Sequence, residues 1–276
     1  MAEDARRSIP VRRSGDLAAE LTDQVAVEEP LQIRVAFGSA GEPPEDLLVT
    51  MRTPGADAEL VRGFLYAEGL LDRAADVLGE SRDDPPGNVL TLSLDAALRP
   101  RFANRRRDFY ATAACGVCGK ASIEALQRRV RHPGGSSGWS IATPALAALP
   151  EALLARQPAF ARTGGMHAAA LFDCDGAISA VREDVGRHNA VDKLVGAALL
   201  AGTLPLIRSG LFVSGRVSFE IIEKASMAGC PLVASVGAPT SLAVDAAWEA
   251  GVTLVGFVRG GRFNIYSLPA RITPGS

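Results

Sequence analysis

Strand and helix patterns alternate regularly along the second half of this 276-residue chain, and this alternation limits its fold more than any other feature. Short apolar runs bounded by turn residues predict strands, and longer stretches with apolar residues at helical spacing predict helices. We expect strands over 166–172, 177–182, 211–213, 232–236 and 252–258, and helices over 189–200, 218–228 and 240–250. Because several of these strands are almost continuously apolar, they are expected to be parallel and buried. The pattern predicts an α/β layered sheet.

The first half of the chain predicts a smaller α+β unit. Residues 1–27 are charged and lack periodicity, which indicates a flexible arm. Apolar runs predict strands over 31–36, 47–51 and 89–94, and Asp57 is placed to cap a helix that runs to Leu70. The Gly- and Ser-rich stretch 132–138 marks the candidate boundary. We therefore expect an N-terminal arm (1–27), an α+β subdomain (28–132) that ends in a cysteine loop and its helix, and an α/β domain (140–276).

Charge and cysteine content narrow the classes of partner and compartment. The net charge of −2 gives no overall field that would attract nucleic acid. Four cysteines in a chain of this length do not make a disulfide scaffold, so a reducing compartment is expected. No apolar segment follows the basic start of the chain, and the longest apolar run, 194–207, is broken by Gly and Pro. We predict a cytoplasmic protein that contacts neither nucleic acid nor a membrane.

The loops that leave the predicted strands of the second half share a composition suited to an anion. They are 182–189, 214–216, 237–241 and 259–262; each contains glycine, and all but 237–241 contain arginine. Ligands of such sheets bind beyond the carboxyl ends of the strands, and arginine binds phosphate through two hydrogen bonds. The four loops together therefore indicate a phosphorylated ligand such as a nucleotide, although the composition of any one of them alone favours an ordinary turn. None of them matches a P-loop or a dinucleotide fingerprint.

Cys115 and Cys118 flank two residues in a small-residue loop that leads into a helix predicted over 120–131. Unpaired N–H groups at the start of this helix and the ammonium of Lys120 favour a thiolate. The spacing suits structural zinc, a thioredoxin-like dithiol or a thiol that carries sulfur. Zinc is disfavoured because the nearest third ligand, His132, has no second histidine close behind it. The small neighbouring residues favour a mobile carrier thiol, with the dithiol oxidoreductase as the alternative.

Five segments make the chain similar to a known family. They are Cys115–Gly119, Thr163–His167, Glu183–Lys193, Ser214–Arg216 and Gly256–Arg262. Through them, the chain from about residue 31 to its end resembles the formate dehydrogenase accessory sulfurtransferase family, FdhD. The resemblance implies a homodimer with a fold similar to that of the cytidine deaminases, a layered mixed sheet with helices on both faces. Deaminase chemistry is not expected, because Ala168 and Ala169 follow His167 where zinc deaminases have a proton-transferring glutamate.

The resemblance also implies a function, the delivery of sulfur during formate dehydrogenase maturation. A cysteine desulfurase would load a persulfide, and the sulfur would pass to the molybdenum or tungsten bis-guanine-dinucleotide cofactor that the formate dehydrogenase apoenzyme then receives. Cys115 would bear the persulfide, with Cys118 as its partner. The guanine-nucleotide site would be lined by Phe257, Val258, Arg259, Gly260, Gly261 and Arg262. A non-catalytic chaperone of the same cofactor is a further alternative.

Other side chains in the predicted loops are candidates for contact with the same ligand. They are His167, Arg187, His188, Ser214 and Arg216. A hydrogen-bonded core position is the alternative for His167, and Asp184 or Asn189, beside His188, is placed to cap the following helix. No residue is assigned to a structural metal. The remaining cysteines, Cys174 and Cys230, are expected to be packing residues.

Overall fold

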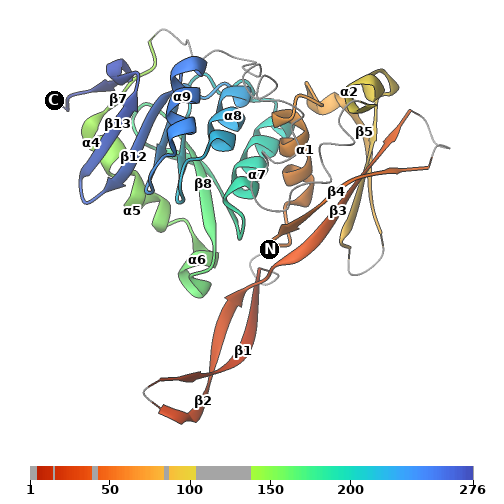
Figure 1. Cartoon of the computed structure of the whole chain (residues 1–276), viewed down its shortest axis with the longest axis horizontal. Helices are drawn as coiled ribbons and strands as arrows, with labels where there is room; N and C mark the ends of the chain where they lie inside the picture. Colours follow the sequence, from red (N-terminus) through yellow and green to blue (C-terminus); the bar gives the residue numbers. More distant parts are fainter. Residues whose placement is uncertain (1–4, 15, 39–42, 84–86, 104–137, 276) are drawn as a thin grey trace.

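The computed structural model describes residues 5–14, 16–38, 43–83, 87–103 and 138–275 (Figure 1). Within these ranges the main sheet has six strands in the order β13-β12-β11-β10-β8-β9. Strands β10, β11 and β12 are parallel to one another, and the other pairings are antiparallel. The strands are β8 (His167–Phe172), β9 (Ile178–Asp184), β10 (Gly210–Val213), β11 (Leu232–Ser235), β12 (Thr253–Arg259) and β13 (Arg262–Ser267). The sheet is mixed, as expected, and β13 is an addition to the predicted strands.

Helices cover both faces of this sheet (Figure 1). Alternate residues of β8 show the cause: Ala169 and Leu171 join the core cluster that includes α7, α8 and α9, whereas Ala170 and Phe172 join a second cluster with Leu149 of α5. The helices are α7 (Arg187–Leu200), α8 (Phe219–Ala228), α9 (Ser241–Ala250), α4 (Thr143–Ala147), α5 (Leu149–Leu154) and α6 (Pro158–Thr163). The predicted mixed α/β architecture is confirmed. Beside it, the short strands β7 (Ile141–Ala142) and β14 (Ile272–Thr273) pair in parallel, and a 3₁₀ turn spans Pro269–Arg271.

A four-stranded sheet in the order β4-β3-β6-β5 forms the N-terminal part. It contains β3 (Glu29–Phe37), β4 (Glu45–Arg52), β5 (Val77–Arg82) and β6 (Val89–Leu94), with α1 (Asp57–Ala67), α2 (Arg99–Ala103) and 3₁₀ turns at Ala74–Asp76 and Ala96–Leu98. The expectation that Asp57 caps α1 is wrong. Ala56 is the cap, and the buried Asp57 carboxylate accepts hydrogen bonds from Arg52 and Arg82. Although burial opposes it, these two arginines lower the pKa of Asp57.

The N-terminal part and the main sheet share one hydrophobic core. A single cluster of buried residues runs from Leu31 in β3 to Leu254 in β12, and α1 packs along α7. At their crossing, a Cβ added to Gly63 would overlap the backbone carbonyl of Asp192, and one added to Gly196 would overlap that of Glu59. The two helix backbones are therefore in direct contact, which only glycine permits. The division into 28–132 and 140–276 stays a prediction.

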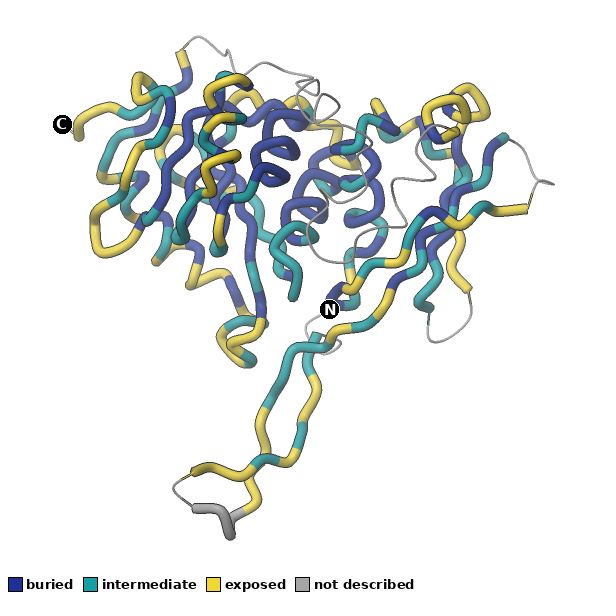
Figure 2. The backbone as a smooth tube through the Cα atoms, in the orientation of Figure 1, coloured by how far each residue is buried: buried dark blue, intermediate teal, exposed yellow. Residues whose placement is uncertain are grey.

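The first described residues form an antiparallel hairpin, β1 (Arg6–Arg13) with β2 (Asp16–Ala26). The expectation that the arm 1–27 lacks regular structure is therefore wrong for these residues. Figure 1 shows the hairpin projecting from the body, and Figure 2 shows that it is largely exposed. Charged residues and Pro10 mask the alternation of Ile9 and Val11 with polar neighbours, which explains why the sequence does not read as a strand. Near its base, β2 packs against α6.

The cysteine loop and the helix predicted behind it fall within residues 104–137 and lie outside the described residues. Among the helices that are described, none combines the length and the apolar character needed to cross a membrane.

Candidate functional site

The four predicted loops gather at one edge of the main sheet. His167 at the start of β8 pairs with Asp184 at the end of β9, and Arg262 at the start of β13 pairs with Arg259 at the end of β12. Because β8 and β13 run opposite to the three parallel strands, their first residues lie where those strands end. We call His167 and the loops 182–189, 214–216, 237–241 and 259–262 the loop edge.

Backbone packs on backbone at the centre of the loop edge. The hydroxyl of Ser235 donates to the carbonyl of Gly215 at 2.7 Å and accepts from the N–H of Gly237 at 2.9 Å. A Cβ added to Gly237 would lie 2.8 Å from the Gly215 carbonyl oxygen, too close for a side chain. The two glycines therefore bring the loops after β10 and β11 together and leave main chain, rather than side chains, at this point of the edge.

His167 and Ser214 lie together at the loop edge. The Ser214 hydroxyl accepts from the N–H of Ala168 at 2.9 Å, and its oxygen lies 3.5 Å from His167 Nδ1. Burial and the positive charge of Arg187 lower the pKa of His167, so the ring is neutral near pH 7. The side chain is half-buried. This burial is compatible with both predicted roles, contact with the ligand and a hydrogen-bonded core position.

His188 faces the start of α8 rather than the centre of the loop edge. Its Nε2 lies 3.0 Å from the Ser218 hydroxyl, and its Nδ1 lies 3.2 Å from a carboxylate oxygen of Glu220. Burial, then Arg187 and Lys224, lower the pKa of His188 to about 3, so the ring is neutral. Its described contacts join α7 to α8.

The start of α7 is capped differently from either expectation. Gly186 is the N-cap, and no side chain accepts the usual capping hydrogen bond. Asp184 Oδ1 accepts from the N–H of Gly186 at 2.8 Å and from the amide of Asn189 at 3.1 Å, so it stabilises the turn one residue earlier. The Asn189 amide also donates to the Met51 carbonyl at 2.7 Å and ties the turn to β4.

The segment 257–262 comprises the end of β12, the turn and the first residue of β13. Phe257 has a φ of 57°, rare for a bulky residue, and its N–H donates to the Gly237 carbonyl at 3.0 Å. Gly260 and Gly261, with φ of 56° and 72°, make the tight turn itself. Val258 is fully buried in the second core cluster, so its side chain packs beneath the turn.

Arginines give the loop edge its positive charge. Arg216, Arg259 and Arg262 are exposed, and the Arg259 guanidinium lies 5.4 Å from the centre of the Phe257 ring. Arg187 is half-buried, and its Nε is buried without a hydrogen-bond partner among the described residues. An unpaired buried N–H is costly, and a phosphate oxygen would satisfy it. The loop edge is therefore suited to an anionic ligand.

Two buried ion pairs on α7, for which none of the predicted loops or motifs gives a sign, fix the position of the loop edge. Lys193 Nζ lies 2.7 Å from Asp184 Oδ2 and donates to the Thr53 carbonyl at 2.9 Å, which joins the N-terminal part to the end of β9. Lys224 Nζ lies 2.7 Å from Asp192 Oδ1. Although burial opposes it, the Asp192 carboxylate raises the pKa of Lys224, which stays charged. Adjacent Asp and Lys in an apolar helix are the signal that could have revealed both pairs.

Comparison with known proteins shows the family to which this chain belongs. The sequence profile of the FdhD/NarQ family matches residues 26–273. The chain belongs to the FdhD/NarQ family. The match covers both the N-terminal sheet and the loop edge, so the expected resemblance is confirmed over nearly the whole chain.

Family relatives match at high identity. The sulfur carrier protein FdhD of Mycobacterium tuberculosis is 47% identical over 270 residues, which cover 94% of this chain and 95% of the relative. The protein of the same name from Anaeromyxobacter sp. strain K is 50% identical over 266 residues, with 91% and 88% covered. A crystal structure from Desulfotalea psychrophila, provisionally named a formate dehydrogenase accessory protein, superposes with a TM-score of 0.71 at 24% identity and covers 97% of this chain and 98% of that chain.

The described residues include one buried and one exposed cysteine. Cys230 is buried, as expected, and burial raises the pKa of its thiol to about 12, so it forms no thiolate near pH 7. Cys174 is exposed in the turn between β8 and β9, so the expected packing role is wrong for this residue. Cys115 and Cys118 lie outside the described ranges, within which no three His, Cys, Asp or Glu side chains are grouped to hold a metal ion.

Proposed function

We propose that this chain is a sulfur carrier that accepts persulfide sulfur from a cysteine desulfurase and transfers it to a molybdenum or tungsten bis-guanine-dinucleotide cofactor. The observation that carries this proposal is the 47% identity, over 94% of the chain, to a protein named sulfur carrier protein FdhD. The chain also contains the spacing of two thiols, Cys115 and Cys118, that such chemistry uses. The final recipient is a formate dehydrogenase apoenzyme, and the working form is a cytoplasmic homodimer.

Loading is a thiol–persulfide exchange. The Cys115 thiolate attacks the outer sulfur of the donor persulfide, the sulfur–sulfur bond of the donor breaks, and the donor cysteine leaves as a thiolate. Cys115 then bears the persulfide. In delivery, the reduced metal centre of the acceptor supplies an electron pair to the outer sulfur, and Cys115 leaves as a thiolate. No other oxidant or reductant is needed, and Cys118 stabilises or relays the persulfide.

The loop edge is the proposed binding site for the acceptor, which is the substrate of this transfer. Its nucleotide phosphates would contact Arg216, Arg259 and Arg262, which are exposed, and the Nε of Arg187, which has no hydrogen-bond partner within the described ranges. The main chain at Gly215 and Gly237 allows close approach.

Mass spectrometry tests the loading step. After incubation with a cysteine desulfurase and cysteine, the wild-type protein should gain a sulfur atom on the peptide that contains Cys115, and Cys115→Ala should lose both this gain and the support of formate dehydrogenase activity in cells. Cys174→Ala removes an exposed thiol far from the cysteine pair in sequence and should behave as wild type. If Cys115→Ala retains loading and activity, the proposal is wrong.

A further inference from the structure

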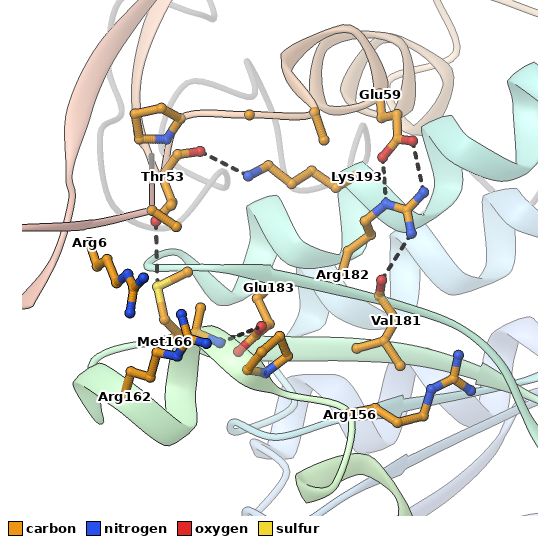
Figure 3. Close-up of a pocket in the computed structure, with 16 residues that line it drawn as sticks. Arg6, Thr53, Glu59, Arg156, Arg162, Met166, Val181, Arg182, Glu183 and Lys193 are labelled. Atoms are coloured by element: carbon orange, nitrogen blue, oxygen red, sulfur yellow. Dashed lines mark hydrogen bonds and ion pairs between the residues drawn. The ribbon is translucent and has the colours of Figure 1, made fainter. Parts of the chain in front are cut away.

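A cavity of about 590 Å³ lies beside β9, away from the residues proposed above for the acceptor (Figure 3). Segments that are distant in sequence form its walls: the base of the hairpin, the loop 53–56 with the start of α1, α6 with the residues before it, Met166 before β8, β9, and Lys193 of α7. A volume of this size is typical of sites for small organic ligands. Of the arginines proposed for the acceptor, Arg187, Arg216, Arg259 and Arg262, none lines it.

Much of the cavity wall is apolar. Pro54 and Ala56 contribute from the loop before α1, Pro158 from α6, Met166 from the approach to β8, and Val181 from β9. A bare inorganic anion would leave these surfaces in contact with water. The wall therefore favours a ligand that has an apolar body as well as any charge.

Most of the charged groups of the cavity are compensated within the protein. Arg182 donates to Glu59 at 2.8 Å, and Lys193 pairs with Asp184. The carboxylate of Glu183 accepts hydrogen bonds from the first N–H groups of α6, at 3.1 and 2.8 Å. Arg156 donates to the carbonyl of Ile178. These groups therefore serve as structural parts of the cavity wall.

Two further arginines in the cavity wall, Arg6 and Arg162, differ from these groups in how their charge is compensated. Among the described residues, neither Arg6 of β1 nor Arg162 of α6 has an ion-pair or hydrogen-bond partner for its guanidinium. Figure 3 shows both side chains in the part of the cavity near Met166, whereas Arg156 lies toward the other end. Two uncompensated guanidinium groups in one cavity match the charge of a phosphate group, which arginine binds through paired hydrogen bonds.

We propose that this cavity is a second ligand site, for a nucleoside phosphate, in which Arg6 and Arg162 bind the phosphate and the apolar wall contacts the base or sugar. The cavity meets the loop edge at Arg182 and Glu183 but contains none of the residues proposed for the acceptor, and the proposal does not depend on the sulfur-carrier role. Because Arg6 belongs to the hairpin and Arg162 to the body, a bound phosphate would join the two.

Isothermal titration calorimetry with GDP, guanosine and pyrophosphate tests the proposal on the full chain. The variant Arg216→Gln/Arg259→Gln/Arg262→Gln removes the three exposed arginines proposed for the acceptor. In this variant, GDP should bind the cavity with one site per chain and more tightly than guanosine or pyrophosphate. Adding Arg6→Gln/Arg162→Gln to this variant should weaken GDP binding by at least about 10-fold. Arg208→Gln, which removes an exposed arginine that does not line the cavity, is the matched control and should change nothing.

Two results would overturn the second site. In one, the variant with Arg6→Gln/Arg162→Gln binds GDP as tightly as its parent, while circular dichroism shows that both have the same fold. In the other, these substitutions weaken binding of an acidic peptide or of the desulfurase while nucleotide binding is unchanged, which would make the surface a protein-docking site. Loss of sulfur loading in Cys115→Ala bears only on the proposed function, so the two proposals fail separately.

Discussion

At the scale of single residues, the candidate site depends on buried groups whose charge the protein sets by contact. Lys193 and Asp184 form an ion pair below the loop edge, whereas His188 is held neutral beside Glu220. A buried group without its partner is costly, so these contacts fix side chains in one arrangement. Within the described part of the chain, no ion pair involves the exposed Arg216, Arg259 or Arg262 above them, so these arginines can bind a ligand.

The neutral state of His188 predicts how stability depends on pH. The unfolded chain binds a proton at this histidine below about pH 6.5, but the folded protein does so only near pH 3. The histidine therefore contributes stability that is fully present above pH 6.5 and is lost as the pH falls toward 3, with a slope of up to about 1.4 kcal/mol per pH unit. Urea unfolding of His188→Gln should show a correspondingly shallower decline in the free energy of unfolding between about pH 6 and pH 4.

Measurement near pH 8, where neither state binds this proton, gives the baseline for that comparison. Parallel curves for wild type and His188→Gln would mean that His188 titrates alike in both states.

Residue identities at the loop edge were predictable, but their roles were not. The glycines and arginines stand out in the sequence, and strand order alone places them at one edge. Whether His188 faces a ligand or Glu220, and whether Val258 lines a site or the core, depends on contacts between elements far apart in sequence. The same holds for Arg6 and Arg162, which the sequence gives no reason to pair.

At the scale of elements, the crossing of α1 and α7 places the N-terminal sheet against the loop edge. Gly63 and Gly196 allow the helix backbones to touch, and the Lys193 ion pair extends the contact to Thr53. The interior strands of the main sheet were predictable because they are apolar runs. Strand β5 was missed because its side chains are mostly exposed and give no apolar signal, and β13 because its alternation is short and begins with Arg262.

This crossing predicts the effect of a single methyl group. Gly63→Ala should lower the free energy of unfolding by about 3 kcal/mol, because its Cβ meets the backbone of α7, which cannot move without shifting the loop edge. Urea unfolding measures the change. Gly79→Ala is the matched control: its Cβ would lie an ordinary 3.7 Å from the Ser93 Cβ, so a change within about 1 kcal/mol is expected. Equal stability of the two variants would contradict the close crossing.

At the scale of the whole molecule, the described residues form one body with a projecting hairpin. None of the hairpin side chains that the structure describes belongs to either core cluster. The body was predictable as α/β with an α+β addition, but the shared core was not, because no local pattern reports that a helix near residue 60 packs on one near residue 190. The hairpin was not predicted because its charged residues obscure the alternation of apolar and polar residues that is typical of a strand.

Deletion of residues 1–26 should therefore leave the body folded. We expect the midpoint of thermal unfolding, followed by circular dichroism, to stay within about 4 °C of wild type, since the lost contacts are few and peripheral. Nucleotide binding at the cavity should fall, because Arg6 is removed. A truncated chain without a cooperative transition would show instead that the hairpin is part of the fold.

The contact between Gly63 and Asp192 also has a consequence for synthesis in the cell. The apolar face of α1 leaves the ribosome about 130 residues before the segment that covers it. At ordinary elongation rates that interval lasts roughly 10 s, during which the nascent chain exposes a surface that a chaperone would recognise. The first half therefore completes its core only after translation has passed the middle of the chain.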